Sequence, residues 1–89
     1  MNNHRLEQPK SYHVYILQSI PHPTCFYTDF TEDLDQRLGE HNRGQYHHTA
    51  RYRPWRIKTV ISFSDKDKTM NFEQYLKASS GRAFAKKRL

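Results

Sequence analysis

The chain has 89 residues, which is enough for one domain with a small core. Only 35% of the residues are hydrophobic, but 13% are aromatic, and disordered chains are poor in aromatics. The net charge of +6 favours a polyanionic partner, and no apolar run approaches the ~20 residues of a membrane span. A single cysteine, Cys25, excludes an internal disulfide and favours a reducing, cytoplasmic setting.

The first half of the chain predicts a hairpin followed by a helix. Residues 1–10 are polar, lack the apolar stretch of a signal peptide, and are expected to form a flexible leader. Residues 11–20 are rich in β-branched and aromatic side chains and predict a strand, which a Pro-His-Pro turn ends. Residues 25–30 predict a second strand, paired with the first as an antiparallel hairpin. Thr31 is the expected N-cap of a helix that ends near Asn42.

The second half predicts one more strand and two helices. Residues 43–54 are expected to form a loop. Residues 55–63 contain apolar and β-branched side chains and predict a third strand. A helix begins at Asp65 or Asp67, and a Ser-Ser-Gly sequence is expected to break it before a basic helical tail at residues 82–89. The order β-β-α-β-α-α indicates an α+β fold with a small antiparallel sheet.

Five side chains on these elements form a chemically coherent set. The two predicted strands can direct the phenols of Tyr15 and Tyr27 to the same side of the hairpin. Arg37 and His41 lie one turn apart and share a face of the first helix. Glu73 lies between apolar neighbours on the second helix, and a partly buried carboxylate needs a partner or a metal ion.

Such a set is suited to phosphodiester hydrolysis. An arginine offers a fixed fork of donors to phosphate oxygens, which Arg37 can supply. A single carboxylate such as Glu73 can hold a Mg²⁺ ion that keeps most of its waters, and the ion stabilises the leaving oxygen. A tyrosine or His41 can act as general base when its pKa is tuned.

The motifs resemble those of a known family. His13-Val14-Tyr15 resembles the first motif of the GIY-YIG nuclease superfamily, and Tyr27-Thr28-Asp29 resembles the second. Residues 31–42 are similar to the arginine-bearing helix of that family. Residues 52–55 and 72–87 resemble small stand-alone bacterial members of the group. The order and spacing of these segments make the match specific over nearly the whole chain.

The resemblance implies a GIY-YIG-like nuclease domain over residues 11–89, with a three-stranded antiparallel sheet flanked by helices. It implies an endonuclease that hydrolyses phosphodiester bonds in DNA and needs Mg²⁺ or Mn²⁺. By the same resemblance, the site residues have family roles. Tyr15 and Tyr27 are active-site tyrosines with Tyr27 as candidate general base, Arg37 clamps phosphate, His41 relays a proton or contacts phosphate, and Glu73 binds the metal.

Two residues depart from the family's motifs. His13 and Asp29 each stand where the family has glycine, and glycine permits positive φ. Aspartate tolerates the left-handed region, but its charge can either repel the scissile phosphate or help to hold the cation. Asp29 therefore leaves open a second interpretation, a catalytically weak or inactive module that binds nucleic acid on the same fold.

Ordinary structural roles compete with the functional ones. Arg37 can pair with Asp33 on the helix surface, and Glu73 can pair with Lys77 or Lys66. A zinc site built from the histidines and the single cysteine is disfavoured, because the spacing matches no common structural zinc motif. A small basic RNA-binding protein outside the superfamily is a third possibility, and it predicts that the site residues lie far apart.

Exposed cations are expected to contact nucleic-acid phosphates, with weak sequence preference. Interleaved aromatics can stack on bases, but Trp55 is interpreted as a core residue. The candidate phosphate contacts are Arg43, Arg51, Arg53, Arg56, Arg82, Lys86 and Lys87.

Overall fold

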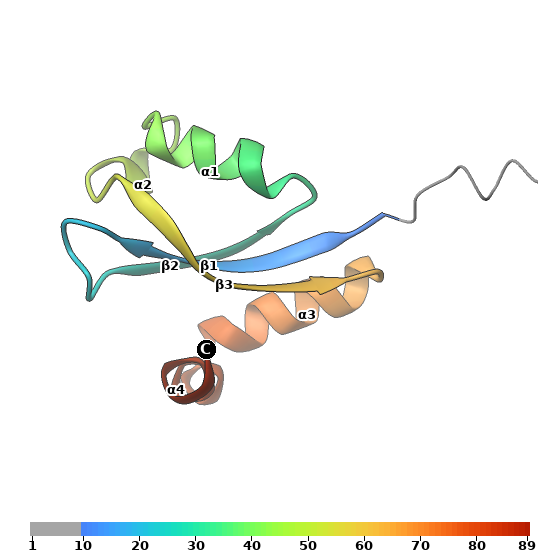
Figure 1. The fold of residues 1–89 in the computed structure, drawn as a ribbon. Helices are drawn as coiled ribbons and strands as arrows, with labels where there is room; N and C mark the ends of the chain where they lie inside the picture. Colours follow the sequence, from blue (N-terminus) through green and yellow to red (C-terminus); the bar gives the residue numbers. More distant parts are fainter. Residues whose placement is uncertain (1–9) are drawn as a thin grey trace, which may run out of the picture.

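The computed structural model describes residues 10–89, so all of the expected leader except Lys10 lies outside the described residues. Its elements are β1 (Tyr12–Ser19), β2 (Phe26–Thr31), α1 (Leu34–Asn42), α2 (His47–Ala50), β3 (Trp55–Phe63), α3 (Lys66–Lys77) and α4 (Ser79–Arg88). The expected α+β fold with a small three-stranded antiparallel sheet flanked by helices is confirmed (Figure 1). Among residues 10–89, no helix is long and apolar enough to cross a membrane.

The sheet has the order β2-β1-β3, so the first strand lies in the middle and β2 is an edge. The predicted β1–β2 hairpin is confirmed, with Tyr15 opposite Asp29 and Leu17 opposite Tyr27. On the other side, Tyr15 lies opposite Val60 of β3. As an edge strand, β2 has no neighbouring strand on one side, and the candidate site lies along this edge of the sheet.

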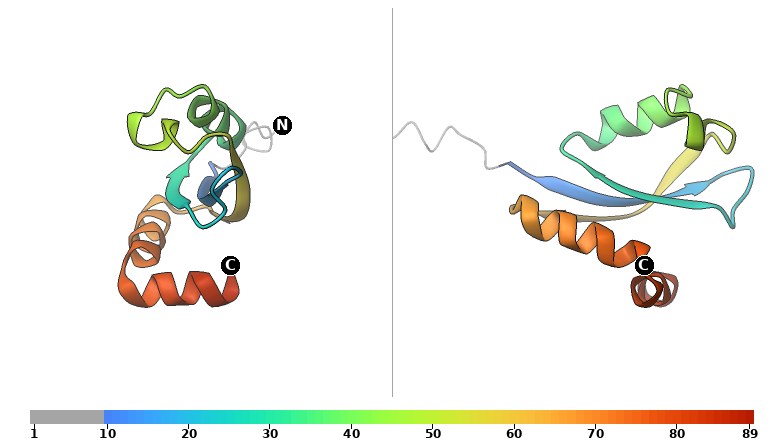
Figure 2. Two further views of the ribbon diagram at one scale, coloured as in Figure 1. Left: turned by 90° about the vertical axis from the view of Figure 1, so that its left-hand side faces the viewer. Right: turned by 180° about the vertical axis from the view of Figure 1, so that it is seen from behind.

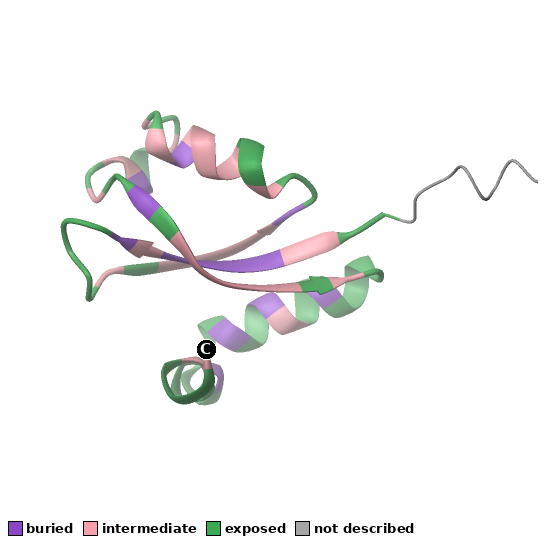
Figure 3. Cartoon of the chain, viewed as in Figure 1, coloured by how far each residue is buried: buried purple, intermediate pink, exposed green. Residues whose placement is uncertain are grey.

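Helices cover both faces of the sheet. The pair α1 and α2 lies on one face, and α3 with α4 lies on the other (Figures 1 and 2). Successive side chains of β1 alternate between these faces. Tyr15 and Leu17 pack under α1, whereas Val14 and Ile16 pack against α3. The middle of β1 is therefore buried from both sides, as the purple segment in Figure 3 shows.

The N-cap of α1 differs from the expectation. Thr31 is the last residue of β2, and the helix begins at Leu34 with Asp33 as its cap. The Asp33 carboxylate accepts a hydrogen bond from the backbone N–H of Gln36 at 3.1 Å. Thr31 instead accepts one from the backbone N–H of Asp33 at 3.1 Å, which fixes the turn before the helix. The predicted end at Asn42 is confirmed, before Gly44 at φ 78°.

Two further segments differ from the expectation. The region expected as a loop contains the short helix α2. The break between α3 and α4 falls at Ala78, which has an extended backbone, and the Ser-Ser-Gly sequence forms the first turn of α4. Gly81 acts there through packing, because a Cβ at this position would lie 1.7 Å from the carbonyl oxygen of Tyr75.

Candidate active site

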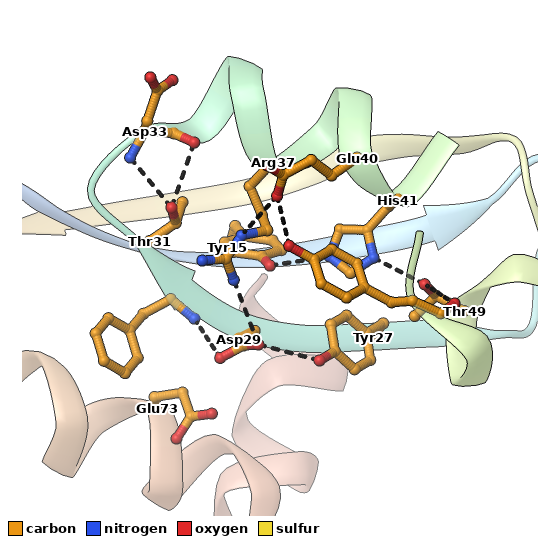
Figure 4. A network of polar contacts seen from close by, with 12 residues as sticks. Tyr15, Tyr27, Asp29, Thr31, Asp33, Arg37, Glu40, His41, Thr49 and Glu73 are labelled. Atoms are coloured by element: carbon orange, nitrogen blue, oxygen red, sulfur yellow. Dashed lines mark hydrogen bonds and ion pairs between the residues drawn. The ribbon is translucent and has the colours of Figure 1, made fainter. Parts of the chain in front are cut away.

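The tyrosines of the two motifs and the arginine-bearing helix meet above the edge of the sheet. Because Leu17 faces Tyr27 and Tyr15 faces Asp29, the two tyrosines are diagonal neighbours on one face. Arg37 and His41 on α1 point toward them (Figure 4). The prediction that both phenols share a face is confirmed. The clustering of these four side chains argues against the third possibility, an RNA-binding protein outside the superfamily in which they lie far apart.

His41 is buried beneath the site, with 1% of its surface exposed. Its Nε2 lies 3.1 Å from the Tyr15 hydroxyl, and its Nδ1 lies 2.8 Å from the Thr49 hydroxyl. Burial, helped by the charge of Arg37, lowers the pKa of His41, so the ring is neutral near pH 7. Both ring nitrogens have protein partners, so His41 positions Tyr15 and does not face an incoming phosphate.

Tyr27 is the tyrosine nearer to solvent, and it has two polar partners. Its hydroxyl donates to Oδ2 of Asp29 at 3.0 Å, and Nε2 of His48 lies 3.1 Å from the same hydroxyl. Burial, followed by the charge of Asp29, raises the pKa of Tyr27. Tyr27 is therefore protonated near pH 7, and it can accept a proton only while passing its own to a neighbour.

Arg37 is held between two carboxylates. Its Nη1 lies 3.9 Å from Asp29 Oδ2, and its Nε lies 3.5 Å from Glu40 Oε1. The ring of Tyr46 lies 5.8 Å from the guanidinium carbon, and its hydroxyl donates to Glu40. The alternative pairing of Arg37 with Asp33 is wrong, because Asp33 caps the helix instead.

The backbone of Asp29 does not need a glycine. Asp29 lies inside β2, and no residue other than glycine has a positive φ within the described part of the chain. The departure from the family's motif therefore acts through the side chain of Asp29 and not through the backbone conformation. Both carboxylate oxygens are engaged, since Oδ1 accepts the backbone N–H of Phe30 at 2.8 Å.

Glu73 approaches the same strand edge from the opposite face. It lies on α3 with 8% of its surface exposed, and Figure 4 shows it across β2 from Arg37, below Asp29. Nζ of Lys77 lies 2.6 Å from its Oε2, so of the two alternative pairings with Lys77 or Lys66 the first is present. The charge of Glu73 also contributes to the raised pKa of Tyr27, which reflects their proximity.

The donors suit a hard cation that keeps its waters. Within residues 10–89, no three His, Cys, Asp or Glu side chains lie close enough together to form a metal cage. A zinc site needs three or four protein ligands, whereas Mg²⁺ is commonly held by one or two carboxylates and several waters. The buried carboxylate of Glu73 fits the second pattern as a single protein ligand.

The family pattern described as GIY-YIG catalytic domain matches residues 11–88. The chain belongs to the GIY-YIG family. The structure-specific endonuclease subunit SLX1 of Scheffersomyces stipitis is 40% identical over 72 residues, which are 73% of this chain and 21% of that protein. The SLX1 subunit of Debaryomyces hansenii is 36% identical over 75 residues, which are 76% of this chain and 22% of that protein.

The chain thus spans about a fifth of the length of these curated relatives. The relatives are fungal proteins of greater length. They give no support to the expectation of a small stand-alone bacterial member, whereas the expectation of a GIY-YIG domain is confirmed.

The expected nucleic-acid contacts of this GIY-YIG domain are all exposed, but they form two groups. Arg43, Arg51 and Arg53 lie at or after the ends of α1 and α2, and Arg56 lies at the start of β3. Arg82, Lys86 and Lys87 lie on α4, on the other face of the sheet. Trp55 is 3% exposed, so its interpretation as a core residue is confirmed.

No pattern in the sequence indicates that α2 contributes to the site. With four residues, α2 is too short to show the helical repeat of apolar residues from which helices are predicted. Its residues reach the site because the connection between α1 and β3 folds back over Tyr27 and His41. His48 and Thr49 were therefore missed as partners of these two side chains. Glu40 was missed as well, although its position one turn after Arg37 is a usual spacing for an ion pair.

Proposed function

We propose that this GIY-YIG domain is a divalent-metal-dependent endonuclease that hydrolyses phosphodiester bonds in DNA. The observation that carries the proposal is the convergence of Tyr27, Arg37 and Glu73 on the edge strand β2 (Figure 4). These side chains provide a proton carrier, a phosphate clamp and a carboxylate for a cation. The SLX1 relatives are named structure-specific endonuclease subunits, and the net charge of +6 suits a nucleic-acid substrate.

Arg37 would bind the scissile phosphate. Its side chain is 31% exposed and borders a depression of about 600 Å³ between β2 and α1. A guanidinium donates two parallel hydrogen bonds to phosphate oxygens, and these bonds strengthen as negative charge develops. A bound phosphate competes with Asp29 and Glu40 for these donors, because both carboxylates lie beside Arg37.

The attacking water must lose a proton as its oxygen bonds to phosphorus. Tyr27 can take that proton while its own hydroxyl proton moves to Asp29 Oδ2, 3.0 Å away. This relay needs no free phenolate, which the raised pKa of Tyr27 disfavours. The phosphorus–oxygen bond to the leaving group breaks, and the leaving oxygen takes a proton from water. A Mg²⁺ or Mn²⁺ ion held by Glu73 would supply positive charge at the phosphate and at the leaving oxygen.

The deciding experiment is cleavage of supercoiled plasmid and branched DNA by the purified protein with Mn²⁺ or with EDTA. We expect nicking that needs the metal and falls on the order of 100-fold or more in Glu73→Gln and in Arg37→Ala. Asp67→Asn and Arg88→Ala are matched controls, because both side chains are exposed and neither lines the depression beside Arg37. Cleavage that persists unchanged in Glu73→Gln and Arg37→Ala refutes the assignment of the site.

The alternative is a module that binds nucleic acid without cutting it. The contact between Asp29 and Arg37 favours it, because the carboxylate lies where a phosphate oxygen would accept the same donor. Salt-dependent DNA binding with no metal-dependent turnover would be the outcome that supports this alternative.

A further inference from the structure

A second hollow lies on the far side of β2 from Arg37. It has a volume of about 720 Å³, between the sheet and the C-terminal helix α4. Its floor is apolar and includes Ile16 and Leu76, which are 6% and 4% exposed. The volume is within the roughly 300–1,000 Å³ that small-molecule sites occupy, so the hollow can take a base with its sugar.

This groove adjoins the candidate active site at the edge strand β2. Tyr27 and Thr28 line it on the β2 side, and Tyr27 is also the partner of Asp29. On the α3 side it is lined by Lys77, whose Nζ lies 2.6 Å from Glu73. A strand whose phosphate lies at Tyr27 and Glu73 can therefore extend into the groove without leaving the protein surface.

The charge of the lining is of one sign. Apart from the tyrosine, its ionisable side chains are Lys58, Lys77, Arg82 and Lys86, and no carboxylate from residues 10–89 lines it. The cations therefore stand around an apolar floor. Such a surface is complementary to a chain with a charged backbone and apolar, planar bases.

An exposed aromatic ring is part of the groove lining. Phe26 begins β2 with 51% of its surface exposed, and Nζ of Lys58 lies 5.7 Å from the centre of its ring. A bulge accounts for the position of Lys58. Ile16 faces Thr59 while the next residue, Leu17, faces Ile57, so Lys58 is the extra residue of β3. Bulges turn a side chain away from the regular alternation.

We propose that this groove binds unpaired nucleotides of the substrate strand beside the cleaved bond, with a base on Phe26 and phosphates at Lys58, Arg82 and Lys86. The inference rests on the proposed endonuclease function and adds the kind of DNA that is selected. A base inside a duplex is already stacked on its neighbours, so only an unpaired base can lie on the ring of Phe26. The domain then prefers DNA in which a duplex adjoins a single strand.

The test is fluorescence anisotropy with a labelled oligothymidylate and with a duplex of equal length, in EDTA and in the Glu73→Gln background. We expect Phe26→Ala to weaken oligothymidylate binding roughly 10-fold and to leave duplex binding unchanged. Phe26→Trp should keep the affinity, because it retains a stacking surface. The matched control is Phe84→Ala, which removes an aromatic that is 38% exposed on α4 and does not line the groove.

For the charged rim, the double variant Lys58→Ala/Lys86→Ala should weaken oligothymidylate binding and flatten its salt dependence, whereas Lys68→Ala on α3 should not. Unchanged oligothymidylate affinity in Phe26→Ala overturns the inference, and so does an equal loss for single strand and duplex. The readout needs no cleavage, so a wild-type protein that never cuts refutes the proposed function alone. Cleavage of branched DNA that is insensitive to Phe26→Ala counts against the groove alone.

Discussion

The hydroxyl of Tyr27 donates to Oδ2 of Asp29 at 3.0 Å, and the same oxygen lies 3.9 Å from Nη1 of Arg37. One carboxylate therefore joins the tyrosine and the arginine on which the proposed reaction depends. Its other oxygen is held by the backbone of Phe30, so the carboxylate cannot swing away without losing that bond. Asp29, which stands where the family's second motif has glycine, thus contacts both of these candidate site residues.

Asp29→Asn should separate the repulsion of DNA by this carboxylate from its role as the proton acceptor of Tyr27. Asparagine keeps the size and an acceptor oxygen but removes the charge, so DNA should bind several-fold more tightly at low salt. The amide cannot take a proton from Tyr27, so cleavage at saturating DNA should become slower. Anisotropy and single-turnover cleavage measure the two effects. Faster cleavage in Asp29→Asn would contradict the relay and make Asp29 a block, in which case Asp29→Gly should cut faster still.

Lys77→Met should lower the Mn²⁺ concentration needed for half-maximal cleavage. The ammonium of Lys77 lies 2.6 Å from Glu73, so a cation must displace it or share the carboxylate with it. Methionine keeps most of the side-chain volume and removes that competitor. A titration of cleavage against Mn²⁺ at saturating DNA measures the shift. Lys68→Met on the exposed surface of α3 is the control, and an equal midpoint for Lys77→Met and wild type would argue against Glu73 as the ligand.

Most of the fold could be predicted from the sequence. The patterns of apolar residues are typical of strands in β1 and β3 and of a helix in α3. Proline in the hairpin turn and glycine after α1 indicate where these elements end. The clustering of Tyr15, Tyr27, Arg37 and His41 followed from this order, because two paired strands and the next helix share one face. The order of the elements along the chain was thus enough to predict the central part of the candidate site.

The rest depended on tertiary packing. Thr31 and Asp33 are both good N-caps by type, and only the end of β2 decided in favour of Asp33. Glycine breaks many helices, but Gly81 lies inside α4 because the corner with α3 leaves no room for a Cβ. The choice of Arg37 partners also depended on where Asp29 points, and a strand residue's neighbours are set by register and not by spacing.

Gly81→Ala should destabilise the domain by roughly 1–3 kcal/mol, because the new methyl group meets the backbone of Tyr75 and α4 must shift. Gly39→Ala is the matched control. The nearest atom there is the end of the flexible Arg43 side chain at 3.0 Å, so the helix should be unchanged or slightly more stable. Urea unfolding measures both variants. Equal stabilities would mean that the α3–α4 corner yields without cost.

The stability of the domain should fall as the pH drops below about 6.5, through His41. Its folded-state pKa is lowered by burial first and by Arg37 second, against the opposing charge of Asp29. Between the folded pKa and the ordinary value, the unfolded chain binds more protons than the folded one. The free energy of unfolding therefore rises with pH in that window. Above the window, the stabilising contribution of neutral His41 is complete.

Urea unfolding at pH 5.5 and 7.5 tests this dependence before most carboxylates titrate. His41→Gln can still hydrogen-bond to Tyr15 and Thr49 but does not titrate, so its stability should be lower at pH 7.5 and should change less between the two pH values. His22→Gln is the control, because His22 is exposed on the β1–β2 turn. If His41→Gln loses as much stability as wild type on going to pH 5.5, the buried ring is not the source of the pH dependence.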